Sequence, residues 1–146
     1  MLPDVLDNDP RSLLQAAGLR ITLPRLTVLE VLSCRPHSTA DTVLHAAREA
    51  QASISVQTVY DVLAACTQAG LVRRIQPAGS PALFETRTDD NHHHLACRAC
   101  GEVVDVDCAV GRAPCLTPSE TAGFALDEAE VVFWGLCPAC QVVPAP

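Results

Sequence analysis

Two pairs of cysteines restrict the possible folds of this chain more than any other feature. They are Cys97-Arg-Ala-Cys100, which is followed by a glycine, and Cys137-Pro-Ala-Cys140. Each C-x2-C pair can place two thiolates on one tetrahedral metal ion, and two pairs supply the four thiolates of a structural zinc site. A redox-active pair or unrelated buried thiols are alternative interpretations. A zinc site would tie the C-terminal end of the chain back to the first strand of its domain.

The N-terminal charges and the distribution of apolar residues predict the cellular compartment. The chain has eight cysteines, and its first ten residues carry three acids and no basic residue, unlike the start of a signal peptide. Its apolar residues are scattered, with no run near the roughly 20 that span a bilayer. We therefore expect a cytoplasmic protein without a membrane partner, in which clustered cysteines indicate metal or redox chemistry rather than a disulfide framework.

The charge is distributed unevenly along the chain. The net charge is −7, but residues 1–80 hold seven arginines and seven acids, whereas residues 81–146 hold three arginines and ten acids. A neutral, arginine-bearing half joined to an acidic half indicates two domains with different roles. The chain contains no lysine, so arginine alone can neutralise phosphates.

The first half has the pattern of several helices followed by a hairpin. Apolar periodicity, polar capping residues and stop glycines predict four helices: 11–17, one capped by Thr22, one capped by Ser38 or Thr39 and ending near 50, and 56–69 capped by Ser55. Strand-like runs follow at 71–76 and 82–86, separated by a turn rich in Pro, Gly and Ser. This order predicts a winged helix-turn-helix domain over residues 1–86, whose last helix would enter the major groove.

The second half predicts a smaller domain. Residues 87–91 are polar and suggest a hinge, and strand candidates at 102–106 and 131–134 flank a loop rich in Gly and Pro. Residues 92–146 would form a small α/β dimerisation domain with too few apolar residues to be stable alone. Metal binding, dimerisation or both would have to supply the remaining stability. The predicted fold class of the whole chain is α+β.

A histidine run suggests a second metal site. If Asn91-His92-His93-His94 is extended, His92 and His94 project to one side and His93 to the other. Two imidazoles on one side can bind a transition metal, and the nearby carboxylates of Glu85 and Asp105 would favour iron or manganese. A solvated polar loop is the alternative interpretation. His37, far upstream, is expected by itself to be an exposed loop histidine.

Polar residues on the predicted fourth helix and several arginines are candidates for DNA contact. Gln57, Thr58 and Tyr60 can meet phosphates and base edges. Phosphate neutralisation could come from the arginines near the second helix and in the hairpin, namely Arg20, Arg25, Arg73 and Arg74. Asp61 has the wrong sign for such a surface, and a merely solvated helix face is the alternative.

The other four cysteines are not paired by spacing. Cys34 and Cys66 lie on apolar helix faces and are expected to be core thiols. Cys108 and Cys115 flank a loop and could form a disulfide or remain inert. No constellation of enzymatic residues emerges, such as a nucleophile elbow or a phosphate-binding glycine loop, so we expect no enzyme.

Taken in order, these motifs resemble the ferric uptake regulator superfamily over residues 11–140. The matching segments include His37-Ser-Thr-Ala40, Ile54-Ser-Val-Gln-Thr-Val-Tyr60, Phe84-Glu85, His92-His-His-Leu95, Cys97-x-x-Cys100-Gly101, Val104-Asp105 and Gly135-Leu-Cys137-x-x-Cys140. The stretch Asp107-Cys-Ala-Val-Gly-Arg-Ala-Pro-Cys-Leu116 looks like the actinobacterial FurA/CatR branch, whose members typically repress a catalase-peroxidase gene.

The resemblance implies a homodimer that binds a palindromic double-stranded DNA operator. Family members hold a structural Zn²⁺ at the positions of the four paired cysteines. Their regulatory ion, Fe²⁺ or Mn²⁺ with Ni²⁺ or Zn²⁺ as substitutes in vitro, lies between the domains on positions that match His37, Glu85, His92, His94 and Asp105. An ion there would fix the angle between the domains, and thereby the spacing of the two recognition helices.

The sensing chemistry implied by the resemblance takes two forms. Bound Fe(II) can react with peroxide and oxidise imidazoles, which in peroxide-sensing relatives match His37 and His92 or His94. Alternatively the ion dissociates when iron or nickel is scarce, and Glu85 stands where a peroxide sensor often has Asp. No small molecule other than the metal ion and peroxide is expected as a ligand.

Two alternative functions do not depend on DNA binding. The chain could be a metal-storage protein, or a thiol oxidoreductase using Cys137 and Cys140.

Two departures from the family's pattern stand out. Asp61 occupies a position that is often Arg, so phosphate contacts there would be redistributed. Many relatives also carry a histidine just before the final Gly-x-Cys that completes an extra metal site in the dimerisation domain. Residues 126–134 contain no histidine, so that site is not expected here.

Overall fold

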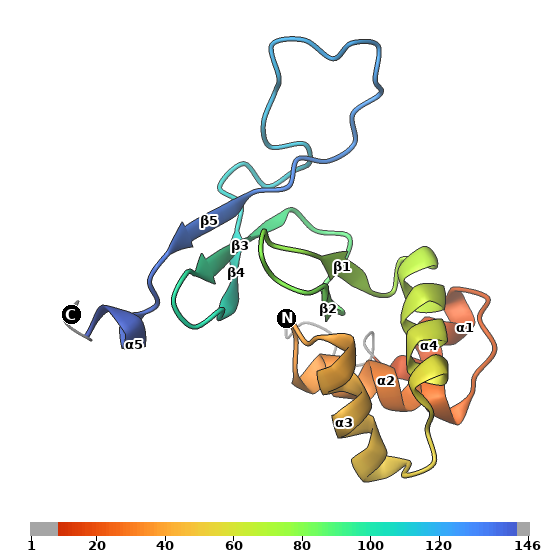
Figure 1. Cartoon of the computed structure of the whole chain (residues 1–146). Coiled ribbons are helices and arrows are strands. Elements are labelled where there is room, and N and C mark those ends of the chain that lie inside the picture. The colour runs from red at the N-terminus through yellow and green to blue at the C-terminus, as the bar shows by residue number, and fades with distance from the viewer. Residues whose placement is uncertain (1–8, 143–146) are drawn as a thin grey trace, which may run out of the picture. The chain divides into compact units, whose positions relative to one another are not determined.

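The computed structural model describes residues 9–142 and divides the chain into two compact units, residues 1–88 and 89–146. Residues 1–8, which hold most of the acidic N-terminal stretch, and residues 143–146 lie outside the description. The N-terminal unit contains four helices and a hairpin, and the C-terminal unit contains a three-stranded sheet and one short helix (Figure 1). The predicted α+β class with an N-terminal helical unit is confirmed.

Side-chain caps define where the four helices of the N-terminal unit begin. The helices are α1 Pro10–Ala16, α2 Leu23–Cys34, α3 Ala40–Ala50 and α4 Val56–Gln68. Each begins after a residue whose side-chain oxygen accepts a hydrogen bond from the backbone N–H three residues later, and these residues are Asp9, Thr22, Thr39 and Ser55. The predicted caps Thr22 and Ser55 are confirmed, and Thr39 rather than Ser38 caps α3.

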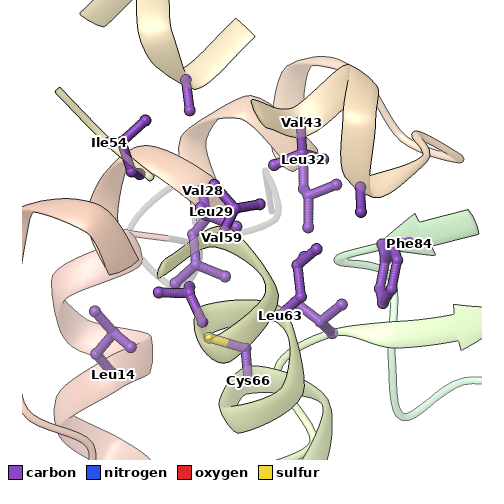
Figure 2. Close-up of a cluster of buried hydrophobic side chains, with 14 residues drawn as sticks. Leu14, Val28, Leu29, Leu32, Val43, Ile54, Val59, Leu63, Cys66 and Phe84 are labelled. Carbon is purple, nitrogen blue, oxygen red and sulfur yellow. The ribbon is translucent and has the colours of Figure 1, made fainter. Parts of the chain in front are cut away.

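The four helices enclose an apolar core of fourteen residues (Figure 2). Helix α4 contributes Val59, Val62, Leu63 and Cys66, at the spacing that places them on one helix face. Cys66 is therefore a core thiol as expected, and burial raises its pKa. The same expectation for Cys34 is wrong: it is exposed, because the buried residues of α2 end at Leu32 and Cys34 is the last residue of the helix.

The hairpin pairs β1 Arg73–Ile75 with β2 Leu83–Glu85 in antiparallel register. The first strand is shorter than predicted because the backbone N–H groups of Leu71 and Val72 donate to the carbonyl of Cys66, at 2.9 and 3.2 Å, and so complete the end of α4. Gly70 makes this exit possible with a φ of +77°.

The C-terminal unit is built on a sheet in the order β4-β3-β5. Its elements are β3 His92–Cys97, β4 Val103–Asp107, β5 Val132–Gly135 and α5 Pro138–Gln141. Strand β4 pairs with β3 in the antiparallel sense, whereas β5 runs parallel to β3. The long connection 108–131 contains no helix or strand, as its Gly and Pro content predicted.

The C-terminal unit buries few side chains, and most of them are histidines. Within the described part, residues 89–142, the buried side chains are His92, His93, His94, Ala96 and Cys97. A row of exposed apolar side chains crosses the sheet, because Leu95 is paired with Val104 on one side and with Phe133 on the other. Among residues 9–142 no helix has both the length and the apolar character that a membrane crossing requires.

Candidate metal centres and DNA-binding surface

Parallel pairing of β3 and β5 brings the two C-x2-C pairs together. Cys97 ends β3 and is paired with Gly135 at the end of β5, so both pairs follow the carboxyl ends of neighbouring strands. Cys137 precedes α5 and Cys140 lies within it. The four sulfurs lie within 4.8 Å of one another, and the Sγ atoms of Cys100 and Cys137 are 3.7 Å apart.

The geometry of these thiols fits tetrahedral zinc. With zinc–sulfur bonds of about 2.3 Å, two ligands on a tetrahedron lie about 3.8 Å apart, which matches the 3.7 Å separation. The backbone N–H of Cys137 donates to the Cys97 sulfur at 3.3 Å, and this bond together with the N–H of Cys100 lowers the pKa of Cys97 to about 6. The neighbouring thiols Cys137 and Cys100 raise the pKa of Cys140 to about 12. Four sulfurs this close together cannot all ionise on their own, because the thiolates repel one another. A divalent cation removes that repulsion, so such a cluster is a typical metal site.

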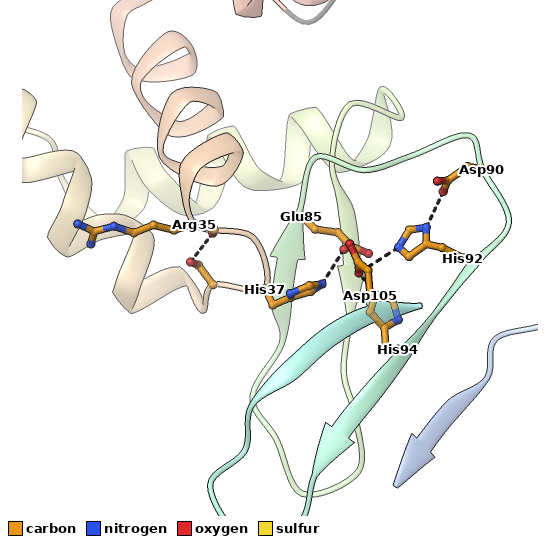
Figure 3. A network of polar contacts seen from close by, with 8 residues as sticks. Arg35, His37, Glu85, Asp90, His92, His94 and Asp105 are labelled. Carbon is orange, nitrogen blue, oxygen red and sulfur yellow. Dashed lines mark hydrogen bonds and ion pairs between the residues drawn. The ribbon is translucent and has the colours of Figure 1, made fainter. Parts of the chain in front are cut away.

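In the N-terminal unit, His37 and Glu85 form one side-chain pair. Their Nε2 and Oε2 atoms are 2.9 Å apart, and Glu85 is fully buried (Figure 3). Ser38 and Phe84 fix this arrangement, because their backbones exchange two hydrogen bonds of 3.2 and 2.9 Å that join the α2–α3 loop to β2. His37 has a φ of +57°, a conformation that non-glycine residues rarely adopt and that is concentrated at functional sites. His37 is therefore not the exposed loop histidine expected from its residue type alone, since only 10% of its side-chain surface is exposed.

In the C-terminal unit, two histidines converge on one carboxylate. His92 and His94 project from the same side of β3, and their Nε2 atoms lie 3.5 and 3.3 Å from Oδ1 of Asp105 on β4 (Figure 3). Both histidines are buried, with exposed fractions of 1% and 0%. The run is therefore a strand with buried histidines and not a solvated polar loop, and imidazole with carboxylate is a donor set suited to iron or manganese.

Asp90 is a functional candidate that the sequence did not reveal. Its carboxylate accepts a hydrogen bond from Nδ1 of His92, which leaves Nε2 of that ring as the lone-pair nitrogen facing Asp105 (Figure 3). A carboxylate in this position orients a metal-binding imidazole and raises its basicity. Asp90 lies in the stretch predicted as a hinge, and only its spacing of two residues from His92 could have pointed to it.

Helix α4 presents a polar face opposite its core face. Gln57 and Tyr60 are exposed, whereas Thr58 is half-buried and its hydroxyl shares a 2.8 Å hydrogen bond with the capping Ser55. The Gln57 amide donates to the carboxylate of Asp61 at 2.8 Å. Asp61 thus ties up a side chain that would otherwise be available to bases, which explains how an acidic residue is accommodated on this face.

The four candidate arginines differ in their surroundings. Arg20 and Arg74 are exposed, and Arg25 is half-buried with Nη1 donating to the carbonyl of Arg20 at 2.6 Å. Arg73 is half-buried and lies directly opposite Glu85 in the hairpin register. A side chain at that position lies on the same side of the hairpin as the buried carboxylate.

The comparisons with known proteins point to one family. Residues 16–133 match the model of the Ferric uptake regulator family. The chain is 57% identical over 129 residues to the transcriptional regulator FurA of Mycobacterium tuberculosis, and the match covers 88% of both chains. The Pseudomonas aeruginosa ferric uptake regulator, solved with manganese, aligns with a TM-score of 0.65 and 30% identity over 88% of this chain and 98% of its own. The Campylobacter jejuni peroxide stress regulator aligns with a TM-score of 0.54 and 26% identity over 66% and 68%.

Proposed function

The chain belongs to the ferric uptake regulator family and is a metal-responsive transcriptional regulator rather than an enzyme, and we propose that it is a peroxide-sensing repressor of catalase-peroxidase-type genes. The observation that carries the proposal is the pair of histidine–carboxylate half-sites. One is His37 with Glu85, and the other is His92 and His94 with Asp105.

Zinc at Cys97, Cys100, Cys137 and Cys140 has a structural role in this proposal. Four thiolates close the coordination shell, so no position is left for substrate or water. The ion joins the end of β3 to α5, and therefore holds together a unit with almost no apolar core. Zinc retained by all four sulfurs would count against the thiol oxidoreductase alternative, because the thiolates would then be ligands and not nucleophiles.

A single regulatory ion binds both half-sites. Each half-site alone fills at most three positions of a six-coordinate ion, whereas three imidazoles and two carboxylates together fill five and bind Fe²⁺ or Mn²⁺ more tightly. The half-sites belong to different units, so an ion that needs both of them favours the one arrangement of the units in which they meet. That coupling turns metal occupancy into a change of DNA affinity.

DNA binding is the role of helix α4 and the β1–β2 hairpin. Tyr60 and Gln57 face solvent from α4, and Arg74 is exposed on the hairpin. In winged helix-turn-helix proteins such a helix enters the major groove while the hairpin contacts the backbone. A palindromic operator would be read by a homodimer, and the exposed apolar row Val104–Leu95–Phe133 supplies a surface for dimerisation.

Peroxide sensitivity is proposed from the buried histidines of the regulatory site. Bound Fe(II) would supply the electrons that reduce peroxide at this position. His37, His92 and His94 are the oxidisable ligands, and an oxidised imidazole donates less strongly to a metal. Loss of the ion would release the operator. The peroxide stress regulator from Campylobacter jejuni shares the fold and supports this assignment.

The test is operator binding under anaerobic conditions before and after a stoichiometric pulse of peroxide. The zinc-loaded protein is supplied with Fe(II) or, as the control, with Mn(II), and its own upstream DNA serves as the operator. We expect peroxide to release the Fe(II) protein and to leave the Mn(II) protein bound. Persistent binding of the Fe(II) protein, lost only on addition of a chelator, would contradict peroxide sensing.

The second candidate function is regulation by iron or nickel supply on the same scaffold. It is favoured by Glu85, since the regulatory site then holds a longer carboxylate than the aspartate often found in peroxide sensors. A metal-storage role is the candidate of another class. Specific operator binding that falls steeply with salt would count against it, because storage needs no phosphate contacts.

A further inference from the structure

A third cluster of metal-binding side chains lies on the opposite side of β3 from His92 and His94. His93 alternates with those residues along the strand and is 5% exposed. It is paired with Val106 on β4, and Cys108 lies two residues beyond Val106, which directs its side chain to the same face as His93. The backbone N–H of Cys108 continues the pairing by donating to the carbonyl of Asn91 at 3.2 Å.

The long connection after β4 returns to this face and contributes Cys115. Its sulfur is 3.0 Å from Nε2 of His93, and the donor atoms of His93, Cys108 and Cys115 all lie within 4.8 Å of one another. Nδ2 of Asn91 donates to the carbonyl of Arg112 at 2.8 Å, which holds the connection against the start of β3.

The polar environment of His93 is incomplete without a further ligand. Its Nε2 lies 3.0 Å from the Cys115 thiol, which is a weak hydrogen-bonding group, and among the described residues its buried Nδ1 has no hydrogen-bond partner. In a buried histidine both ring nitrogens normally have hydrogen-bond partners, one nitrogen as a donor and the other as an acceptor. A buried polar group without such a partner often indicates an absent ion or water.

We propose that His93, Cys108 and Cys115 form a second thiolate-containing zinc site, separate from the four-cysteine site and from the regulatory half-sites. Two thiolates and one imidazole favour zinc over iron or manganese. Tetrahedral zinc places such donors about 3.5–3.8 Å apart, so the cluster, whose donor atoms all lie within 4.8 Å, would take the ion once the 3.0 Å contact between His93 and Cys115 opens by about 0.5 Å. Three protein donors leave one position, which water can fill because Cys108 and Cys115 are only half-buried.

The site would fix the first part of the connection 108–131 to the sheet. This segment is exposed and contains no helix or strand, so few other interactions restrain it. A metal bridge from His93 on β3 to Cys115 closes a loop of 22 residues, and the amides near Cys115 should then exchange their hydrogens more slowly. The ligand set is independent of the regulatory site, so this inference can fail while the proposed function holds.

The test is Co(II) titration of the reduced full-length protein, prepared anaerobically with its tightly bound zinc in place. Thiolate-to-cobalt charge-transfer absorption reports a cysteine ligand, whereas the nitrogen and oxygen donors of the regulatory half-sites produce none. We expect this absorption in the wild type and in Cys34→Ser, which removes an exposed cysteine outside the cluster. It should be lost in Cys115→Ser and weakened in His93→Ala, with the zinc of the four-cysteine site and the far-ultraviolet circular dichroism unchanged.

Hydrogen exchange supplies an independent readout that needs no variant. Zinc added to the wild-type protein should slow exchange in the segment around Cys115. Charge-transfer absorption that persists in Cys115→Ser, or its absence from the reduced wild type, would overturn the proposal. So would a Cys108–Cys115 disulfide, seen as a loss of two hydrogens in the intact mass of the anaerobically purified protein.

Discussion

The N-terminal unit encloses fourteen core residues from its helices, loops and hairpin, whereas the described part of the C-terminal unit buries only Ala96 and Cys97 beside three histidines. Burial of apolar surface can stabilise the first unit without any ligand. The second unit has little such surface to bury, and its closest side-chain contacts join histidines, carboxylates and thiols. We therefore expect packing to stabilise the first unit, and the proposed metal sites and dimerisation to supply the stability that the second unit lacks.

The largest expected effect is the loss of zinc from the four-cysteine site. Cys137→Ser should abolish zinc retention and unfold the C-terminal unit, because a structural zinc contributes an apparent binding free energy of about 10–16 kcal/mol. The N-terminal unit should keep its own thermal transition. Metal analysis with scanning calorimetry of the full chain measures both, and Cys34→Ser is the matched control. Equal destabilisation of the two units would contradict the comparison.

The reverse experiment removes core volume from the N-terminal unit. Leu32→Ala should lower the free energy of unfolding of that unit by about 2–5 kcal/mol, because the side chain is fully buried in the apolar core. Zinc content should not change. Chemical denaturation followed by circular dichroism is the measurement, with the exposed Val56→Ala as the control. Loss of zinc in Leu32→Ala would mean that the two units do not fold independently.

A smaller effect is expected at the carboxylate that orients His92. Asp90→Asn should weaken Mn(II) binding roughly 10- to 100-fold, since the hydrogen bond to Nδ1 loses its charge. Titration followed by electron paramagnetic resonance measures the affinity. The neighbouring Asp89→Asn is the control, because Asn tolerates the φ of +60° found there. Equal losses in both variants would indicate a general charge effect and not an oriented imidazole.

The two units also differed in how far their sequences predicted them. In the N-terminal unit the caps Thr22 and Ser55, the range of the fourth helix and the buried position of Cys66 are confirmed, because caps and helical periodicity are local properties. The prediction that Cys34 is a core thiol was wrong, because apolar periodicity does not reveal where the end of a helix extends beyond the core. In the C-terminal unit the paired cysteines predicted a four-thiol cluster by their spacing alone.

The remaining features of the C-terminal unit depend on contacts between residues distant in sequence. The parallel pairing of β3 with β5 joins segments separated by more than thirty residues, and no local pattern reveals it. The approach of Cys115 to His93 depends on the path of an irregular connection. Asp90 was missed because a carboxylate that supports a ligand has no spacing rule comparable to that of the ligands themselves.

On the DNA-binding face a charge change should have a modest effect. Asp61→Asn keeps an acceptor for the Gln57 amide and removes a negative charge from α4. Operator affinity should rise by about 0.5–1 kcal/mol, roughly two- to fivefold in Kd, and the gain should be larger at low salt. Fluorescence anisotropy at several salt concentrations measures it. Glu49→Gln, which removes the same charge from α3, should change affinity less.

The smallest expected effect concerns the number of protons released when zinc binds. Near neutral pH, zinc uptake by the reduced metal-free protein should release fewer than four protons from the four thiols, because a pKa of about 6 leaves Cys97 already ionised. Below that pKa the number should rise, since Cys97 is then protonated before binding. Calorimetric titration in buffers of different ionisation enthalpy gives the count. A number that does not change across that pKa would contradict the assignment of Cys97 as the most acidic thiol.

The most direct test of the account is the operator affinity of His37→Ala with and without Mn(II). His37 belongs to the N-terminal unit, outside the zinc site, and the exposed His45→Ala is the matched control. The wild type and His45→Ala should bind the operator about tenfold or more tightly with Mn(II). His37→Ala should show no such increase while it retains zinc and the dimeric state. Normal activation of His37→Ala would contradict the claim that one ion needs donors from both units.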